Sequence, residues 1–267
     1  MKKGPVNKSL DDFIRRKKKE LIKYNKKKTN TDNDYKPYGI SIVLATMRQH
    51  SIASVFDNYS RQDFENKEMI IVLNNNSMVF DEWASKAREY EDVKVFQLED
   101  RITLGECLNF GVSQSKYNYI AKFDDDDYYG PKYLSDSIKA FNLVDADMVG
   151  KSASFVYFEK SKTLAIRNSR FENRYVKHMD GSTFIIKRGV FDKIKFADIP
   201  RAIDVQFSKD CIRSGFKIYS TNRYHHVYIR HGSPSKHTWK ISDEDLLRKY
   251  CKIVKEDIDD YRKYVDI

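Results

Sequence analysis

The chain has 267 residues, 40% of them hydrophobic and 13% aromatic, which is enough for one domain with a buried core. Its formal net charge is +10, but residues 1–36 carry 13 basic and 5 acidic groups, so the rest is nearly neutral. This distribution argues against a nucleic-acid partner for the whole chain. The three cysteines are far apart with no CxxC pair, which argues against disulfides or structural zinc and favours the cytoplasm.

The first 36 residues predict a basic helical arm followed by a linker. Ser9 is a candidate N-cap, and apolar residues then follow one helical stripe: Leu10, Phe13, Ile14, Leu21 and Tyr24. The N-terminus lacks the apolar segment of a secretory signal, and no apolar run is long enough to span a bilayer. The arm is expected to lie on the anionic inner face of a membrane, to dock on a partner, or to be a solvated helix.

Residues 40–123 alternate between short apolar runs and helical patterns. Strands are predicted at 40–45, 69–73, 93–98 and 119–123, and helices at 51–59, 81–90 and 104–115. This alternation predicts a mostly parallel central sheet flanked by helices, an α/β fold. Ligands of such sheets bind beyond the carboxyl ends of the strands, which here carry Thr46, Asn74 and Asp124.

The second half is less regular. Strands are predicted at 147–158, 183–187, 217–220 and 224–230, a helix at 204–214, and a closing helix at 243–255. No Pro/Gly-rich linker separates the halves, so residues 37–240 are expected to form one composite domain with halves 37–130 and 131–240. Residues 241–267 are expected to form a C-terminal helix.

Four consecutive aspartates, Asp124 to Asp127, follow the strand predicted at 119–123. Their like charges repel, and a bound cation would offset that repulsion. Mg²⁺ and Mn²⁺ prefer carboxylate oxygens together with substrate phosphates. A solvated acidic turn is the alternative. No GxxxxGK[ST] or GxGxxG motif is present, so neither a P-loop nor a dinucleotide-binding fingerprint is available to bind phosphate.

Four segments, in this order, resemble family 2 glycosyltransferases of the GT-A fold, a Rossmann-like architecture. They are Ser41 to Thr46 (SIVLAT), Ile70 to Ser77 (IIVLNNNS), Leu104 to Gly111 (LGECLNFG) and Tyr119 to Asp127 (YIAKFDDDD). The likeness covers roughly residues 38 to 235 and is stronger in the first half.

The resemblance implies a nucleotide-sugar donor, commonly a UDP-sugar, bound by the first half. Thr46 would lie near the base and ribose, and Asn74 stands where the family usually has an aspartate that binds uracil. Asp126 would be the direct ligand of Mn²⁺ or Mg²⁺. Asp124 and Asp125 would face the ribose or metal-bound water, and Asp127 would cap the following turn.

The resemblance implies that the second half binds a carbohydrate or glycolipid acceptor. Asp204 is the candidate catalytic base, with a helix N-cap as the alternative role and Asp210 as the nearest rival. Gly181 and Ser182 match the small-residue stretch under the acceptor sugar.

Late in the chain, His231 is the candidate second metal ligand, with a structural role as the alternative. Arg230, Lys236 and His237 are candidate diphosphate contacts.

The resulting expectation is a metal-dependent, inverting glycosyltransferase of cell-surface or spore polysaccharide synthesis. A sugar nucleotidyltransferase is one alternative, but residues 46–50 lack the glycines of its phosphate loop. A non-enzymatic scaffold that binds membrane or nucleic acid through its basic arm, with a degenerate transferase body, is the other.

Overall fold

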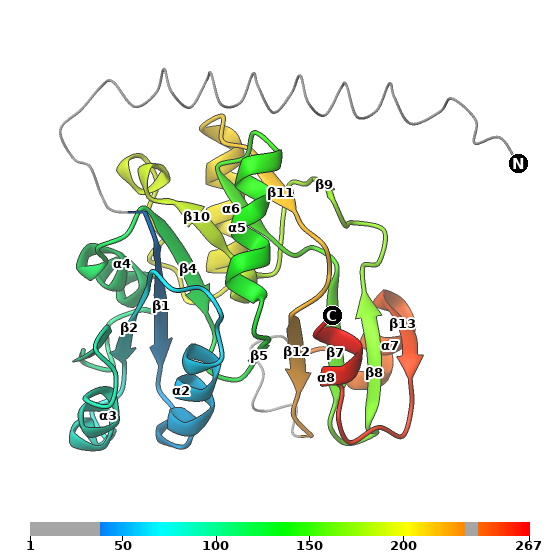
Figure 1. Cartoon of the computed structure of the whole chain (residues 1–267), viewed down its shortest axis with the longest axis horizontal. Helices are drawn as coiled ribbons and strands as arrows, with labels where there is room; N and C mark the ends of the chain where they lie inside the picture. The colour runs from blue at the N-terminus through cyan, green and yellow to red at the C-terminus, as the bar shows by residue number, and fades with distance from the viewer. Residues whose placement is uncertain (1–37, 233–239) are drawn as a thin grey trace, which may run out of the picture.

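A computed structural model describes residues 38–232 and 240–267 (Figure 1). The predicted basic arm and two predicted diphosphate contacts, Lys236 and His237, lie outside the described residues. No helix in the described ranges is both long and apolar enough to cross a bilayer.

The first half of the described chain forms four parallel strands of a larger sheet, as the alternating pattern predicted. In the sheet the strands run in the order β3 (Val93–Gln97), β2 (Lys67–Leu73), β1 (Ile40–Thr46) and β4 (Tyr119–Phe123). The connecting helices are α2 (Ile52–Ser60), α3 (Phe80–Ala87) and α4 (Leu104–Gln114).

Strand β1 is buried on both of its faces. Ile42 and Leu44 belong to one core with residues of α2, α3 and α5 (Tyr133–Leu143), whereas Val43 belongs to a second core with residues of α4 and α6 (Ile203–Arg213). Alternate residues of a strand point to opposite faces, so the continuous apolar sequence matches this two-sided cover. Helix α4 packs so closely that a Cβ on Gly111 would lie 2.5 Å from Val43 Cγ1.

The second half extends the same sheet beyond β4 with strands in the order β10, β6, β11 and β9. Their bounds are β10 (Ile185–Lys187), β6 (Met148–Gly150), β11 (Ile218–Ser220) and β9 (Arg174–Tyr175). Strand β10 is antiparallel to β4 and β6, and β9 is antiparallel to β11. The eight-stranded sheet is therefore mostly parallel, which confirms the predicted fold class.

A second, five-stranded sheet stands beside the first and was not predicted (Figure 1). Its order is β13 (Cys251–Lys255), β8 (Thr163–Arg167), β7 (Ser154–Phe158), β12 (His226–Arg230) and β5 (Tyr128–Tyr129). Helices α7 (Asp243–Tyr250) and α8 (Arg262–Val265) contribute Leu246 and Val265 to its two small cores. Strand β5 follows the four aspartates directly, so their loop connects the two sheets.

The single strand predicted at 147–158 is wrong, because the chain leaves the larger sheet after β6 and enters the smaller one at β7. At the switch, the backbone N–H of Lys151 donates to Thr183 Oγ1 at 2.8 Å, and that of Ser152 donates to Ser220 Oγ at 2.9 Å. Side-chain hydroxyls thus satisfy the backbone where no strand partner is available.

The closing helix predicted at 243–255 is wrong beyond Tyr250, and residues 241–267 are not one helix. Residues 251–255 form β13, an edge strand antiparallel to β8 with a register shift between Ile253 and Lys255. The β-branched Ile253 and Val254 suit a strand, and pairing with β8 supplies hydrogen bonds that an isolated helix end lacks.

Candidate active site

Three polar side chains lie at the carboxyl ends of adjacent parallel strands, as predicted. Thr46 ends β1, Asn74 follows β2, and Asp124 follows β4, with β1 between the other two strands. The backbone N–H of Asn74 donates to Thr46 O at 2.8 Å, which ties two of these ends together. The sheet therefore gathers the predicted donor-binding residues along one edge.

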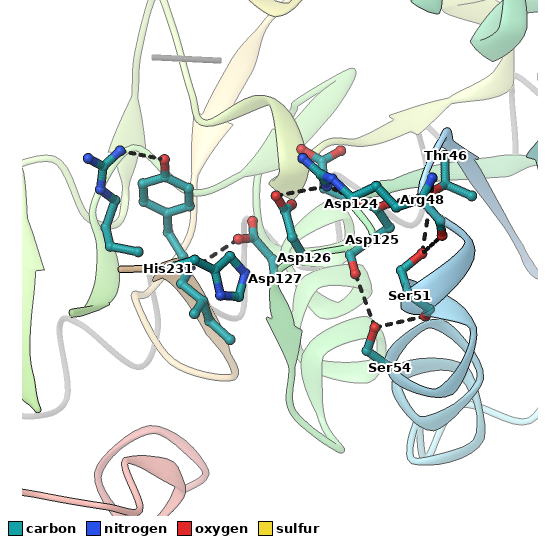
Figure 2. A network of polar contacts seen from close by, with 12 residues as sticks. Thr46, Arg48, Ser51, Ser54, Asp124, Asp125, Asp126, Asp127 and His231 are labelled. Atoms are coloured by element: carbon teal, nitrogen blue, oxygen red, sulfur yellow. Dashed lines mark hydrogen bonds and ion pairs between the residues drawn. The ribbon is translucent and has the colours of Figure 1, made fainter. Parts of the chain in front are cut away.

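Asp125 is buried and points toward β1 and α2 (Figure 2). Its Oδ2 accepts a hydrogen bond from Thr46 Oγ1, and its backbone carbonyl accepts one from Ser54 Oγ at 3.1 Å. Because buried hydrogen-bonded carboxylates are costly to move, Asp125 fixes the position of the cluster. Any contact of Thr46 or Asp125 with a donor remains a prediction.

Arg48 is a site residue that the sequence analysis did not single out. Its Nη1 pairs with Asp125 Oδ1 and lies 2.9 Å from Asp126 Oδ2, so one guanidinium nitrogen bridges two carboxylates (Figure 2). The Arg48 side chain is 31% exposed. A cation of the protein itself thus neutralises part of the cluster.

The surroundings of Asp126 disfavour its charged form. Burial, followed by the charges of Asp127, Asp125 and Asp124, raises the pKa of Asp126 to about 8, although Arg48 opposes the rise. A carboxyl in this setting favours either a proton or a bound cation at neutral pH.

Lys122 is a second site residue that was not singled out. It is a buried lysine in β4 whose Nζ forms an ion pair with Asp124 Oδ1. Burial alone would lower the pKa of Lys122, but the nearby charges of Asp124, Asp204 and Asp127 outweigh burial and raise it. Lys122 therefore remains a cation between the aspartate cluster and the candidate base.

Asp127 does not cap the following turn, which corrects the prediction. Its Oδ1 accepts a hydrogen bond from the backbone N–H of Ile229 at 3.3 Å, and its Oδ2 lies 3.3 Å from His226 Nε2. Burial raises the pKa of Asp127, but hydrogen bonds from His226 and Ser182 outweigh burial and lower it. Asp127 therefore joins the cluster loop to β12 of the smaller sheet.

The candidate base and the predicted acceptor stretch lie against each other. A Cβ on Gly181 would lie 2.6 Å from Asp204 Cβ and 3.1 Å from Asp204 Oδ2. Ser182 is buried, and its backbone carbonyl accepts a hydrogen bond from Tyr129 Oη at 2.8 Å. Tyr129 Oη also accepts from the backbone N–H of Asp124 at 2.8 Å, which ties the acceptor stretch to the aspartate cluster.

Asp204 is not the N-cap of α6, so the alternative role does not hold. The N-cap is Ala202, in the left-handed conformation with φ 58°, and it makes no side-chain cap hydrogen bond. Asp204 lies in the first helical turn, where the helix dipole favours a carboxylate. The rival, Asp210, lies inside the helix and accepts hydrogen bonds from Gln206 Nε2 at 2.9 and 3.0 Å.

Asn74 uses its amide nitrogen to hold the loop after β3. Its Nδ2 donates to Glu99 O at 2.9 Å and to Ile102 O at 3.1 Å. Both amide hydrogens are therefore used, and the side chain offers its carbonyl oxygen, an acceptor, to a ligand.

The late residues Arg230 and His231 both contact carboxylates of the protein. Arg230 is fully buried, with Nε 2.8 Å from Asp243 Oδ1 and Nη2 2.8 Å from Ile241 O. This anchors the chain ahead of α7 and gives Arg230 a structural role in place of the predicted diphosphate contact. The Nδ1 of His231 lies 2.9 Å from Glu159 Oε2. Its role as a metal ligand remains a prediction.

The sequence matches a known protein family. The sequence model described as "Glycosyl transferase family 2" matches residues 41–195, more than half of the chain. The chain belongs to glycosyl transferase family 2. The match covers β1 to β4, the aspartate cluster and the Gly181–Ser182 stretch.

Known glycosyltransferase and TarS sequences and structures are similar to this chain. The O-antigen biosynthesis glycosyltransferase WbnJ of Escherichia coli is 29% identical over 116 residues, 42% of this chain and 44% of WbnJ. The S. aureus TarS 1-349 structure in complex with UDP-GlcNAc has a TM-score of 0.60 at 16% identity, over 79% of this chain and 64% of that one. A crystal structure of S. aureus TarS matches with a TM-score of 0.60 at 17% identity, over 72% of this chain and 37% of that one. The chain spans less than two thirds of the length of each of these proteins. The likeness to TarS, at 16% and 17% identity, shows the fold alone.

The family 2 resemblance implies a divalent metal, and the donor chemistry of the cluster fits one. Asp126 is partly exposed, carries a raised pKa, and already pairs with a cation, Arg48. Carboxylate oxygens of this kind suit Mn²⁺ or Mg²⁺. Within the described residues, no three His, Cys, Asp or Glu side chains converge in a ready-made metal cage. A metal at Asp126 would therefore share its coordination with the donor phosphates.

Arg48 and Lys122 were missed for different reasons. Lys122 had a sequence signal, because a lysine interrupts the otherwise apolar strand Tyr119–Phe123. Arg48 is an ordinary loop residue, and only the contact between the β1 loop and the cluster shows its role.

Proposed function

We propose that this family 2 member is a metal-dependent, inverting glycosyltransferase that moves a sugar from a UDP-sugar to a hydroxyl of a carbohydrate or glycolipid acceptor. The observation that carries the proposal is the contact between Asp204 and Gly181, tied through Tyr129 to the aspartate cluster. This arrangement joins a candidate base to a candidate donor site, as transfer between two substrates requires.

The choice of a UDP-sugar rests on the residues at the strand ends and on the TarS complex with UDP-GlcNAc. Asn74 Oδ1 is oriented by the two hydrogen bonds of its amide nitrogen and would accept the N3–H of a uracil ring. Cytosine has no hydrogen at N3, so this arrangement favours uracil. The sugar itself is left open by these contacts.

The donor side of the reaction needs stabilisation of a departing diphosphate. Asp126 would hold the divalent metal, with Asp124 beside it. When bound, the metal supplies positive charge to the diphosphate as negative charge develops on it. Asp125, held by Thr46, keeps the loop in place.

The acceptor side of the reaction needs a base. Asp204 would take the proton of the acceptor hydroxyl. As it does so, the hydroxyl oxygen attacks the anomeric carbon of the donor sugar, and the bond from that carbon to the diphosphate oxygen breaks. Lys122 stays protonated and lies near both Asp124 and Asp204, so its charge would help to hold these carboxylates in place.

We further propose a role in cell-surface or spore polysaccharide synthesis. The support is the similarity to WbnJ, which acts in O-antigen biosynthesis. The basic arm of residues 1–36 would then keep the enzyme near an anionic membrane surface, where lipid-linked acceptors are found.

Calorimetric titration with UDP, with and without Mn²⁺, tests the donor site. We expect the wild type to bind UDP more tightly with Mn²⁺, and Asp126→Ala to lose this metal-dependent gain. Asp81→Ala, on the exposed start of α3, is the matched control and should behave as wild type. UDP affinity that is the same with and without Mn²⁺ would reject the metal role.

A further inference from the structure

The bridge made by Arg48 has features of an exchangeable contact. Its Nη1 lies between Asp125 and Asp126, the carboxylate proposed to bind metal. The side chain is 31% exposed, and that of Asp126 is 24% exposed. A partly exposed ion pair is weak compared with a buried one, because water competes for both partners.

The backbone around Arg48 is fixed, so an exchange requires motion of the side chain only. The N–H of Arg48 donates to Thr46 Oγ1 at 3.0 Å, and the same hydroxyl binds Asp125. Asp125 would therefore keep its position when the guanidinium leaves. Asp126, in contrast, has Arg48 as its only ion-pair partner within the described residues.

A guanidinium and a divalent cation compete for the same carboxylate oxygens, and their positive charges repel. Arg48 and a metal ligated by Asp126 are thus mutually exclusive in the position that Arg48 now holds. A nucleotide diphosphate brings negative charge with which a displaced guanidinium can form charge-assisted hydrogen bonds.

We propose that Arg48 is a tethered cation that neutralises the aspartate cluster when the donor is absent and swings from Asp126 to the diphosphate when metal and donor bind together. The proposal rests on the donor site described above. The consequence is coupling: Arg48 opposes metal binding to the donor-free protein, and the diphosphate removes that opposition.

The experiment measures free Mn²⁺ by its electron paramagnetic resonance signal during titration of the full chain, without and with UDP. Arg48→Met removes the charge and keeps a long unbranched side chain, and Arg48→Gln is a second neutral variant. Arg88→Met removes an exposed arginine at the end of α3 and is the matched control. Thermal unfolding of each variant confirms that it is folded.

Without UDP, we expect both neutral Arg48 variants to bind Mn²⁺ about two- to fivefold more tightly than wild type, the scale of a partly exposed ion pair. UDP should tighten Mn²⁺ binding to wild type by a larger factor than to Arg48→Met. Arg88→Met should match wild type.

Equal Mn²⁺ affinities of wild type and both Arg48 variants without UDP would overturn the proposal and leave the donor site intact. A failure of all proteins to bind Mn²⁺ even with UDP would instead reject the metal in the proposed function, and the exchange with it.

Discussion

The carboxylates of the aspartate cluster differ because each has a different partner. Asp125 is held by Thr46, Asp124 by Lys122, and Asp127 by β12, whereas Asp126 pairs with Arg48 among the residues that the structure describes. Adjacent identical residues in a tight loop point in different directions, and Asp126 is the one whose cationic partner, Arg48, is itself partly exposed and can give way to a ligand, whereas Lys122 beside Asp124 is buried. This is the residue-level reason for assigning the metal to Asp126.

Asn74 gives a prediction at the scale of one functional group. In Asn74→Asp no amide nitrogen donates to Glu99 O and Ile102 O, and the new charge faces two carbonyl oxygens. We expect a loss of about 1–3 kcal/mol in the free energy of unfolding and weaker UDP binding, because buried acceptors lose their donor. Urea unfolding and calorimetry measure both.

Asn76→Asp, in the exposed turn two residues on, adds the same charge and should change neither quantity. Wild-type stability and UDP affinity in Asn74→Asp would show that the amide nitrogen is not needed to hold the loop.

At the scale of elements, the active site depends on how closely α6 approaches the 3-10 helix η2 (Gly181–Thr183). The Cβ that Gly181→Ala adds would lie 2.6 Å from Asp204 Cβ, so the start of α6 must shift. We expect a cost of about 1–3 kcal/mol in stability. Sugar transfer should fall strongly while UDP affinity is kept, since the donor site is built from other elements.

Gly189→Ala is the control, because the nearest atom to its added Cβ would be 3.8 Å away. Transfer rates and UDP affinities of the two variants separate a shifted base from a general loss of folding. A Gly181→Ala enzyme with the wild-type rate would mean that Asp204 need not sit where the structure has it.

Lys151 marks the point where the chain passes between the sheets, and it is fully buried. Its Nζ donates to Asn222 O at 2.7 Å and lies 5.5 Å from the centre of the Tyr133 ring. Burial lowers the pKa of Lys151 to about 7, although Asp136 and Glu172 oppose this. The unfolded chain, with an ordinary lysine pKa, therefore binds one proton more than the folded chain above pH 7.

The sign of the pH effect follows from this difference. As pH rises from about 7 toward 10, the free energy of unfolding should gain up to about 1.4 kcal/mol per pH unit from Lys151. Lys151→Met should lack this gain, and Lys139→Met, at an exposed position of α5, should retain it. Urea unfolding at several pH values compares the slopes. Parallel slopes for wild type and Lys151→Met would contradict the lowered pKa.

At the scale of the whole molecule, the sequence predicted the larger sheet better than the smaller one. Strand β4 has the predicted bounds, and β1 to β3 differ by one or two residues, because each is a continuous apolar run closed by a polar turn. The smaller sheet was missed because pairs such as β12 with β5 join residues far apart in the chain. The helix α5 was not assigned, although Leu134, Ile138 and Phe141 fall at helical spacing.

The candidate site was predicted to a similar degree. Strand ends and the cluster follow from parallel-sheet geometry. The family resemblance gave Asp204 and Gly181 as separate candidates of the acceptor half, and the structure brings them into contact. The contacts of Arg48 and Asp127 were not foreseeable, because each depends on which loops meet in space, whereas Lys122 pairs with Asp124 only two residues away. Arg230 was misjudged because its partner Asp243 lies beyond the predicted site.

The central claim is that Asp204 is the base of a sugar transfer from a nucleotide diphosphate donor. The most direct test compares wild type, Asp204→Asn and the control Asp210→Asn for UDP release from a UDP-sugar with water as acceptor, and for UDP affinity. We predict that Asp204→Asn lowers the rate by about 10²-fold or more, the usual contribution of a general base, with unchanged UDP affinity. Release of UDP by Asp204→Asn at the wild-type rate would contradict the claim.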